Sequence, residues 1–440
     1  MIKSVKAPVA VAALMALSAC GIFKGHGKKT PVLGDRVPIL VSESDAKPDP
    51  SLASVQVLLP DPVANTEWTQ SAGNAAKDMQ HLALGQSVSR AWVARIAGGS
   101  NRERLAAAPV IADGRLYAID VNAVVHSFDA TTGAAGWTTE IAQGNQNRDA
   151  RFGGGVSYED GKLYATDGLG DVVALNAKDG SVIWRVRPGG PLRGSPTLAN
   201  GQIYVLSQDN QLFALSQADG KVAWTASGSL ESQGVFGVAA PAAAQGTIVA
   251  GFSSGELNAY RYENGRSLWG DALSRSAIST SVSSLADIDA DPVVDQGRVY
   301  AVGQGGRMVA TDITTGQRLW EQDFASLSTP WVAGEWIFVV TDEAKLVCIA
   351  RGTGKIRWIS QLRGFKNVKK HKDAIYWNGP VLAGGRLILV NSRGEIVFAS
   401  PQDGHVERTI ETKSTFSLPP VVANDTLYLL DHDGQILAYR

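Results

Sequence analysis

Two short strings in the chain have the residue types of reactive sites. Residues 251–255, Gly-Phe-Ser-Ser-Gly, match the G-x-S-x-G pattern of a serine nucleophile, which needs a sharp turn from a strand into a helix. Residues 287–291, Asp-Ile-Asp-Ala-Asp, begin like a calcium loop, but Pro292 and Arg298 stand where its turn glycine and bidentate glutamate belong. The first string occupies a hairpin-turn position of an internal repeat, as Asp209-Asn210 does in another copy, so we predict a turn.

Metal and cofactor sites have little support in the local sequence. None of the six histidines falls at metal-ligand spacing. Residues 303–306, Gly-Gln-Gly-Gly, lack the third glycine and the helix of a phosphate-binding loop. Folding could still bring distant ligands together, but the sequence predicts no catalytic residue, no metal ligand and no cofactor.

An internal repeat decides the architecture. A turn residue recurs and is followed twenty-three positions later by Trp in six of seven copies, the seventh having Arg408. The pairs are Gly114 and Trp137, Gly161 and Trp184, Gly201 and Trp224, Gly246 and Trp269, Gly297 and Trp320, Glu335 and Trp358, and Gly385 and Arg408. Proline stands five positions before most of these turn residues, and Pro420 before Asp425 opens an eighth copy.

Each copy contains four short strands, which is the unit of a propeller blade. The eighth copy ends at Arg440 after its third strand, and the missing strand is found at residues 87–96, with Trp92. We therefore predict an all-β, eight-bladed propeller of four-stranded antiparallel blades, closed by the N-terminal strand. An open solenoid is the alternative, and it would leave the Trp92 strand without a partner.

The repeated tryptophans have a structural explanation. One large ring at the same place in nearly every blade favours packing between neighbouring blades over a binding surface. We assign this inter-blade role to Trp92, Trp137, Trp184, Trp224, Trp269, Trp320 and Trp358.

The first residues have the pattern of an export signal. Lys3 and Lys6 precede an apolar stretch and the small residues Ser18-Ala19. Residues 17–21, Leu-Ser-Ala-Cys-Gly, resemble the bacterial lipobox, which implies that Cys20 carries lipid. Because Gly21 is not aspartate, the resemblance implies an anchor at the outer membrane, on its periplasmic face. A cleaved signal with an incidental cysteine is the alternative.

The rest of the chain divides by composition. We predict a signal peptide at 1–19, a lipidated N-terminus and Pro-rich tether at 20–64, a short segment packed on the propeller at 65–86, and the propeller at 87–440. With Cys20 lipidated, only Cys348 remains, so no intrachain disulfide forms. The net charge of −1 argues against a nucleic-acid partner, although residues 366–372 form a basic cluster.

The copies also resemble a known repeat. Residues 310–320, Ala-Thr-Asp-Ile-Thr-Thr-Gly-Gln-Arg-Leu-Trp, look like the A-x-D-x-x-T-G-x-x-x-W motif of pyrroloquinoline-quinone (PQQ) propellers, and residues 128–137 are similar. Two families share that motif: the quinoprotein dehydrogenases, and the BamB family, lipoproteins of the outer-membrane β-barrel assembly machinery.

The two families imply different functions. The dehydrogenases carry a vicinal Cys-Cys disulfide over the cofactor and hold calcium in the channel, whereas Cys348 has no neighbouring cysteine. A lipobox, a tether and an eight-bladed body are similar to the BamB family as a whole. The resemblance thus implies a non-enzymatic scaffold whose propeller is a monomer within a hetero-complex, and a periplasmic PQQ-dependent dehydrogenase is the alternative.

The BamB resemblance also implies partner-binding residues. In that family the contact with BamA, the central barrel protein, is made by adjacent inter-blade loops, one of the form R-L-S-D-V-D-x-x-P. Residues 284–292 match it, so Leu285, Asp287 and Asp289 carry over. The preceding loop lacks the family's arginine, and Val235 and Phe236 would supply an apolar contact instead. A solvated acidic loop is the alternative for the aspartates, and edge pairing with unfolded barrel strands is a second mechanism.

Overall fold

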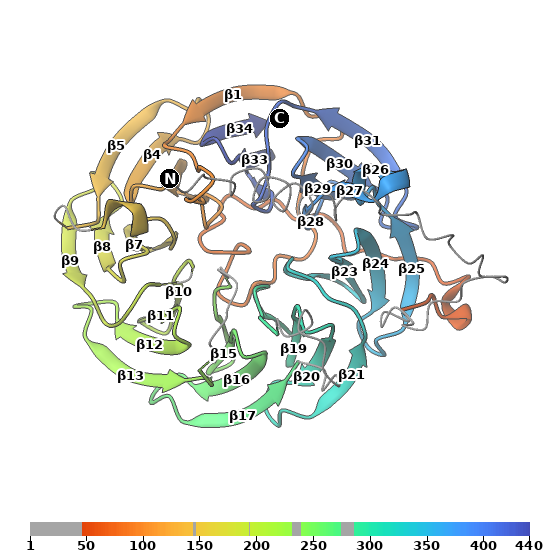
Figure 1. Cartoon of the computed structure of the whole chain (residues 1–440), viewed down its shortest axis with the longest axis horizontal. Coiled ribbons are helices and arrows are strands. Elements are labelled where there is room, and N and C mark those ends of the chain that lie inside the picture. Colours follow the sequence, from red (N-terminus) through yellow and green to blue (C-terminus); the bar gives the residue numbers. More distant parts are fainter. Residues whose placement is uncertain (1–45, 144–146, 193, 231–238, 274–285) are drawn as a thin grey trace, which may run out of the picture. The chain divides into compact units, whose positions relative to one another are not determined.

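The structure is a computed structural model that describes residues 46–143, 147–192, 194–230, 239–273 and 286–440. Eight four-stranded antiparallel sheets stand radially around a central channel (Figure 1). The predicted all-β, eight-bladed propeller is confirmed. Within the described ranges, no helix is long and apolar enough to cross a membrane.

The first four blades follow one another along the chain, each from its innermost to its outermost strand. Blade 1 contains β2 (Val110–Ala112), β3 (Arg115–Ile119), β4 (Val124–Asp129) and β5 (Ala135–Glu140). Blade 2 contains β6 (Val156–Glu159), β7 (Lys162–Thr166), β8 (Val172–Asn176) and β9 (Val182–Val186). Blade 3 contains β10 (Thr197–Ala199), β11 (Gln202–Leu206), β12 (Gln211–Ser216) and β13 (Val222–Ser227). Blade 4 contains β14 (Ala242–Ala244), β15 (Thr247–Gly251), β16 (Glu256–Arg261) and β17 (Ser267–Ala272).

The second half of the ring continues this order and ends in the closure. Blade 5 contains β18 (Val293–Asp295), β19 (Arg298–Val302), β20 (Met308–Asp312) and β21 (Arg318–Gln322). Blade 6 contains β22 (Trp331–Ala333), β23 (Trp336–Val340), β24 (Lys345–Ala350) and β25 (Ile356–Gln361). Blade 7 contains β28 (Trp377–Ala383), β29 (Arg386–Asn391), β30 (Glu395–Ala399) and β31 (Val406–Glu411). Blade 8 contains β32 (Val421–Ala423), β33 (Thr426–Leu430), β34 (Gln435–Tyr439) and, from the N-terminal side, β1 (Arg90–Arg95).

Blade 8 closes the ring as predicted. β1 pairs antiparallel with β34, and Trp92 lies opposite Ala438. Ser89 and Arg440 extend this pairing through two backbone hydrogen bonds of 2.6 and 2.9 Å. Because β1 pairs with β34 in one sheet, the ring exposes no extra strand edge there.

The turn between the first two strands of a blade explains the repeated glycine. Asp113 and Gly114 both have positive φ, 49° and 71°, and the same pair of signs recurs at Asn200-Gly201. Two consecutive positive φ values are the geometry of a tight hairpin turn, which Asn-Gly and Asp-Gly adopt at low cost. The hairpin prediction for residues 251–255 is also confirmed, because these residues join β15 to β16.

The tryptophans lie where neighbouring blades meet. Six indole N–H groups donate to a backbone carbonyl of the next blade, as Trp137 does to Ala177 at 3.0 Å. The other five pairs are Trp184 and Gln217, Trp224 and Tyr262, Trp269 and Ile313, Trp320 and Arg351, and Trp358 and Pro401. Each ring also covers a glycine of the next blade's outer turn; a Cβ at Gly133, for example, would lie 2.6 Å from the Trp92 ring.

Five further elements of the described residues lie outside the blades. The single-turn 3-10 helices are η2 (Pro50–Leu52), η3 (Arg148–Ala150) and η4 (Val368–Lys370). β26 (Phe365–Asn367) and β27 (Lys372–Ala374) form a separate two-stranded sheet between blades 6 and 7. The predicted tether extends to residue 64, whereas in the structure Asp49 already donates its N–H to Ile356 of β25 at 2.8 Å.

Candidate functional site

The two ends of the channel differ in what they display. In an antiparallel four-stranded blade, the turn between the second and third strands and the loop to the next blade lie at the same end. We call this end of the propeller the loop face. The turns between the first and second strands and between the third and fourth strands form the opposite end, which we call the turn face.

Residues 65–82, which we call the inner segment, run around the channel wall and bond to the innermost strand of every blade in order (Figure 1). Its eight partners, from blade 8 and then blades 1 to 7, are Val422, Ile111, Tyr158, Leu198, Ala243, Val294, Trp331 and Leu382. An innermost strand would otherwise present unpaired N–H and C=O groups to the channel. The inner segment therefore pairs with part of the exposed polar groups along the channel wall.

Apolar anchors fix the inner segment. Trp68 is 2% exposed, exchanges two backbone hydrogen bonds with Ile111, and stacks on Trp331 with ring centroids 6.2 Å apart. Leu82 is also buried and donates its N–H to Leu382 of β28 at 3.1 Å. Through Trp68, the inner segment thus contacts both blade 1, at Ile111, and blade 6, at Trp331.

A buried charged pair adds a polar anchor. The Lys77 ammonium is buried and donates to Thr197 Oγ1 at 3.1 Å, and Asp291 accepts hydrogen bonds from Ser71 Oγ at 2.6 Å and the Ala240 N–H at 2.7 Å. Burial lowers the pKa of Lys77 to about 8, although the charge of Asp291 opposes the shift. Burial likewise raises the pKa of Asp291, and the charge of Lys77 opposes that shift.

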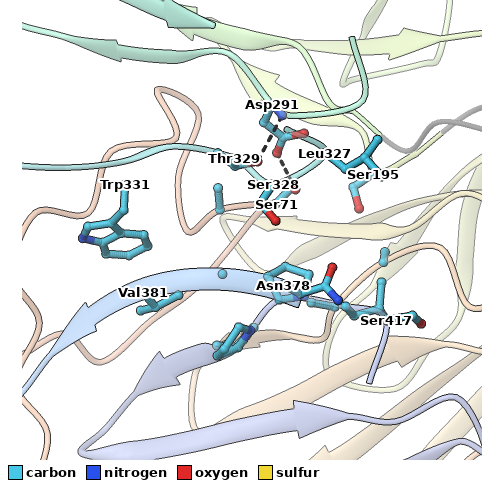
Figure 2. A pocket seen from close by; sticks show the side chains of 18 of the residues that line it. Ser71, Ser195, Asp291, Leu327, Ser328, Thr329, Trp331, Asn378, Val381 and Ser417 are labelled. Carbon is cyan, nitrogen blue, oxygen red and sulfur yellow. Dashed lines mark hydrogen bonds between the residues drawn. The ribbon is translucent and has the colours of Figure 1, made fainter. Parts of the chain in front are cut away.

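A small cavity lies between the inner segment and the inter-blade loops. It has a volume of about 110 Å³ and is lined by Trp68, Asp289, Asp291 and Asn378, among others. Figure 2 shows Ser71 and Thr329 hydrogen-bonded to Asp291 at its wall. A larger depression of about 660 Å³ adjoins it on the loop face, lined by residues of blades 6 to 8 that include Tyr376, Phe416 and His432.

The structure places the two predicted acidic residues side by side in the loop before β18, and both are buried. Asp287 is 1% exposed and Asp289 is 7% exposed. The Asp287 carbonyl accepts the Gln304 N–H at 2.9 Å, and Gln304 Nε2 donates to Asp289 Oδ2 at 3.3 Å. Through Gln304, both aspartates contact the β19–β20 turn of their own blade. Asp289 also lines the small cavity. Val235, Phe236, Leu285 and Cys20 lie outside the described residues.

The described residues contain no group of three His, Cys, Asp or Glu side chains that could hold a metal ion. Ser253 is in the β15–β16 turn, and its N–H donates to Asn210 Oδ1 at 3.1 Å. Cys348 is buried in β24, and burial raises its pKa well above the usual value. No arrangement of a nucleophile with a base is found among these candidates.

Comparison with known sequences identifies relatives along most of the chain. Residues 121–360, more than half of the chain, match the family described as outer membrane protein assembly factor BamB. BamB of Yersinia pestis is 28% identical over 331 residues, covering 74% of this chain and 81% of that protein. BamB of Escherichia coli K12 is 28% identical over 352 residues, covering 79% of this chain and 87% of that protein.

Comparison with solved structures supports the propeller fold, but the TM-scores for BamB and for the quinoprotein dehydrogenases are similar. The crystal structure of BamB from Moraxella catarrhalis matches with a TM-score of 0.68 at 19% identity, covering 80% of this chain and 100% of that one. A europium-containing methanol dehydrogenase matches with a TM-score of 0.65 at 14% identity, covering 84% of this chain and 89% of that one. The sequence match is therefore the discriminating result, and it shows that the chain belongs to the BamB family of outer membrane protein assembly factors.

Proposed function

We propose that this protein is a non-enzymatic scaffold of the outer-membrane β-barrel assembly machinery, lipid-anchored through Cys20 at the periplasmic face of the outer membrane. Its loop face docks the periplasmic part of a BamA-like protein and thereby assists insertion of barrel proteins. The observation that carries the proposal is the family match over residues 121–360. A ring of rigid blades suits this role, because loops on a rigid support make precise recognition surfaces.

The channel supports the scaffold over the dehydrogenase. Small-molecule sites typically enclose about 300–1,000 Å³, whereas the cavity at the loop-face end of this channel encloses about 110 Å³. The inner segment occupies the channel wall, where the charge of Lys77 partly offsets the effect of burial on the pKa of Asp291. The adjoining larger depression has a single carboxylate, Asp342, among its lining residues, so it does not offer the carboxylate set of a calcium-bound quinone. The residues present do not fit that cofactor.

The docking part of the proposal is tested by the acidic pair. Because both side chains are buried, they would act on docking through the loop before β18 that they hold against Gln304. We expect Asp287→Asn with Asp289→Asn, in the full-length chain, to reduce capture of the barrel-assembly protein roughly tenfold in a pull-down from membranes. Asparagine keeps the side-chain volume, which suits two buried positions better than charge reversal.

A matched control is available on the turn face. Asp179→Asn with Asp219→Asn removes two exposed carboxylates there and should leave capture unchanged. Equal capture by both double variants and the wild type, with unchanged thermal unfolding, would remove Asp287 and Asp289 from the docking site.

A further inference from the structure

The connection between blades 6 and 7 contains a small two-stranded sheet, which the other connections do not contain in the described residues. It comprises β26, η4 and β27, with Phe365 paired to Ala374 and Asn367 to Lys372. We call residues 363–374 the basic hairpin. It begins just beyond the end of β25 and forms its own two-stranded sheet, separate from both blades.

The basic hairpin concentrates positive charge. It contains Arg363, Lys366, Lys369, Lys370 and Lys372 against the single acidic residue Asp373, in a chain whose net charge is −1. All five cations are exposed. Arg363 pairs with Glu395 at 3.5 Å, and none of the four lysines takes part in the ion pairs found among the described residues. The lysines are thus available to an external anion.

An apolar residue sits at the tip of this charge cluster. Val368 is 62% exposed and lies in η4 between Lys366 and the pair Lys369 and Lys370. Lysine stems can lie along an apolar surface while their ammonium groups reach outward. A valine tip surrounded by lysines therefore suits the boundary between acyl chains and anionic headgroups.

The N-terminal part of the chain contacts the same blade. Asp49 pairs with Lys355 at 3.0 Å and donates its N–H to Ile356, and Arg357 donates to the Val55 carbonyl at 2.6 Å. Lys355 immediately precedes β25, and Ile356 and Arg357 begin it, whereas the basic hairpin follows its other end. The two features thus share the blade 6 side of the ring, the contacts of residues 49–55 toward the turn face and the basic hairpin toward the loop face. Figure 1 shows residues near 50, in red, beside β25, with β26 and β27 at the same side of the ring.

We propose that the basic hairpin binds the anionic phospholipid surface of the membrane and turns the blade 6 side of the propeller toward it. The proposal rests on the membrane attachment given under Proposed function. A polybasic patch with an apolar residue at its tip is attracted to anionic lipids and orients the protein that carries it, whatever anchors the chain. Lysine, a compact point charge, suits phosphate headgroups without the bidentate geometry by which arginine recognises a protein carboxylate.

Vesicle flotation tests this inference directly. The substitution Cys20→Ser in the full-length chain removes the contribution of the lipid anchor to membrane binding. This variant is mixed either with vesicles of phosphatidylethanolamine and phosphatidylglycerol or with vesicles of phosphatidylcholine alone. We expect binding to the anionic vesicles only, weaker at about 0.3 M than at about 0.05 M salt. Replacing Lys366, Lys369, Lys370 and Lys372 by glutamine should lower the partition coefficient roughly a hundredfold or more.

A matched variant controls for net charge. Glutamine at Lys162, Lys178, Lys221 and Lys413, all exposed on other blades, removes the same charge and should leave vesicle binding within about twofold. Val368→Ser should weaken binding by several-fold and leave its salt dependence in place.

Two outcomes would overturn the inference. One is equal vesicle binding by the hairpin variant and the matched variant. The other is unchanged vesicle binding together with loss of partner capture by the hairpin variant in the lipidated chain, which would make the patch a protein contact. Because the vesicles contain no partner protein, failure of the docking proposal alone would leave the vesicle result unaffected.

Discussion

The inner segment and the basic hairpin both lie outside the repeat, yet they are built in opposite ways. The inner segment buries Trp68 and Leu82 and bonds to all eight blades, whereas the basic hairpin exposes Val368 and bonds mainly within itself. The first should contribute to stability and the second to binding.

The largest expected effect is at Trp68, in the inner segment. We expect Trp68→Ala to lower the free energy of unfolding by about 3–5 kcal/mol, because it leaves a cavity beside Trp331 and Ile111. Urea denaturation measures the change. Tyr376→Ala, at a position 67% exposed beside the basic hairpin, is the control, with an expected change below about 0.5 kcal/mol. Similar losses in both variants would contradict the comparison.

The next largest loss of stability is expected from removing the buried ammonium group of Lys77. Lys77→Met leaves Asp291 as a buried carboxylate without its cation, and we expect a loss of about 3 kcal/mol. Adding Asp291→Asn should recover at least half of the loss, because the remaining group no longer needs a charge nearby. Additive losses in the double variant would show that the two residues do not interact.

The same lysine predicts a pH dependence. Its pKa is about 8 in the folded protein and 10.5 in the unfolded chain, so between these values the unfolded chain binds the extra proton. The contribution of Lys77 to stability therefore rises with pH from about 8 to 10. Above pH 10, tyrosines with raised pKa, such as Tyr117 at about 12, act in the opposite direction. The Lys77→Met variant should lack the rise seen in wild-type urea denaturation, and an identical slope would disprove the assignment.

The smallest effect should belong to the basic hairpin. Replacing its four lysines by glutamine should change the free energy of unfolding by less than about 0.5 kcal/mol, because these exposed side chains pack against little. Thermal and urea unfolding provide the measurement. A loss above about 2 kcal/mol would mean that the basic hairpin supports the fold and would remove its contrast with the inner segment.

The repeat made most of the fold predictable from sequence, including the one irregular copy. Trp358 covers Gly404 in the outer turn of blade 7, but blade 8 has no such turn, because its third and fourth strands come from opposite chain ends. Arg408 therefore has no turn to cover. It instead lies 5.8 Å over the Phe398 ring and donates to the Val88 carbonyl. The missing tryptophan is a consequence of ring closure.

The inner segment could not be traced from sequence. It has no period, and its bonds reach eight strands that are distant in the chain, so local pattern gives no register. Lysine is typical of surface positions, and the burial of Lys77 is understood only once the structure shows the buried Asp291. Similarly, nothing local indicates that Asp287 and Asp289 would turn toward Gln304.

Photo-crosslinking tests the central claim, docking through the loop face, most directly. A benzophenone side chain replaces Leu327, 45% exposed in a loop-face connection, or Val182, 46% exposed beside an outer turn on the turn face. In cells expressing the full-length chain, we predict a crosslink to the barrel-assembly protein from position 327 and none from position 182. A crosslink from position 182 alone would contradict the account.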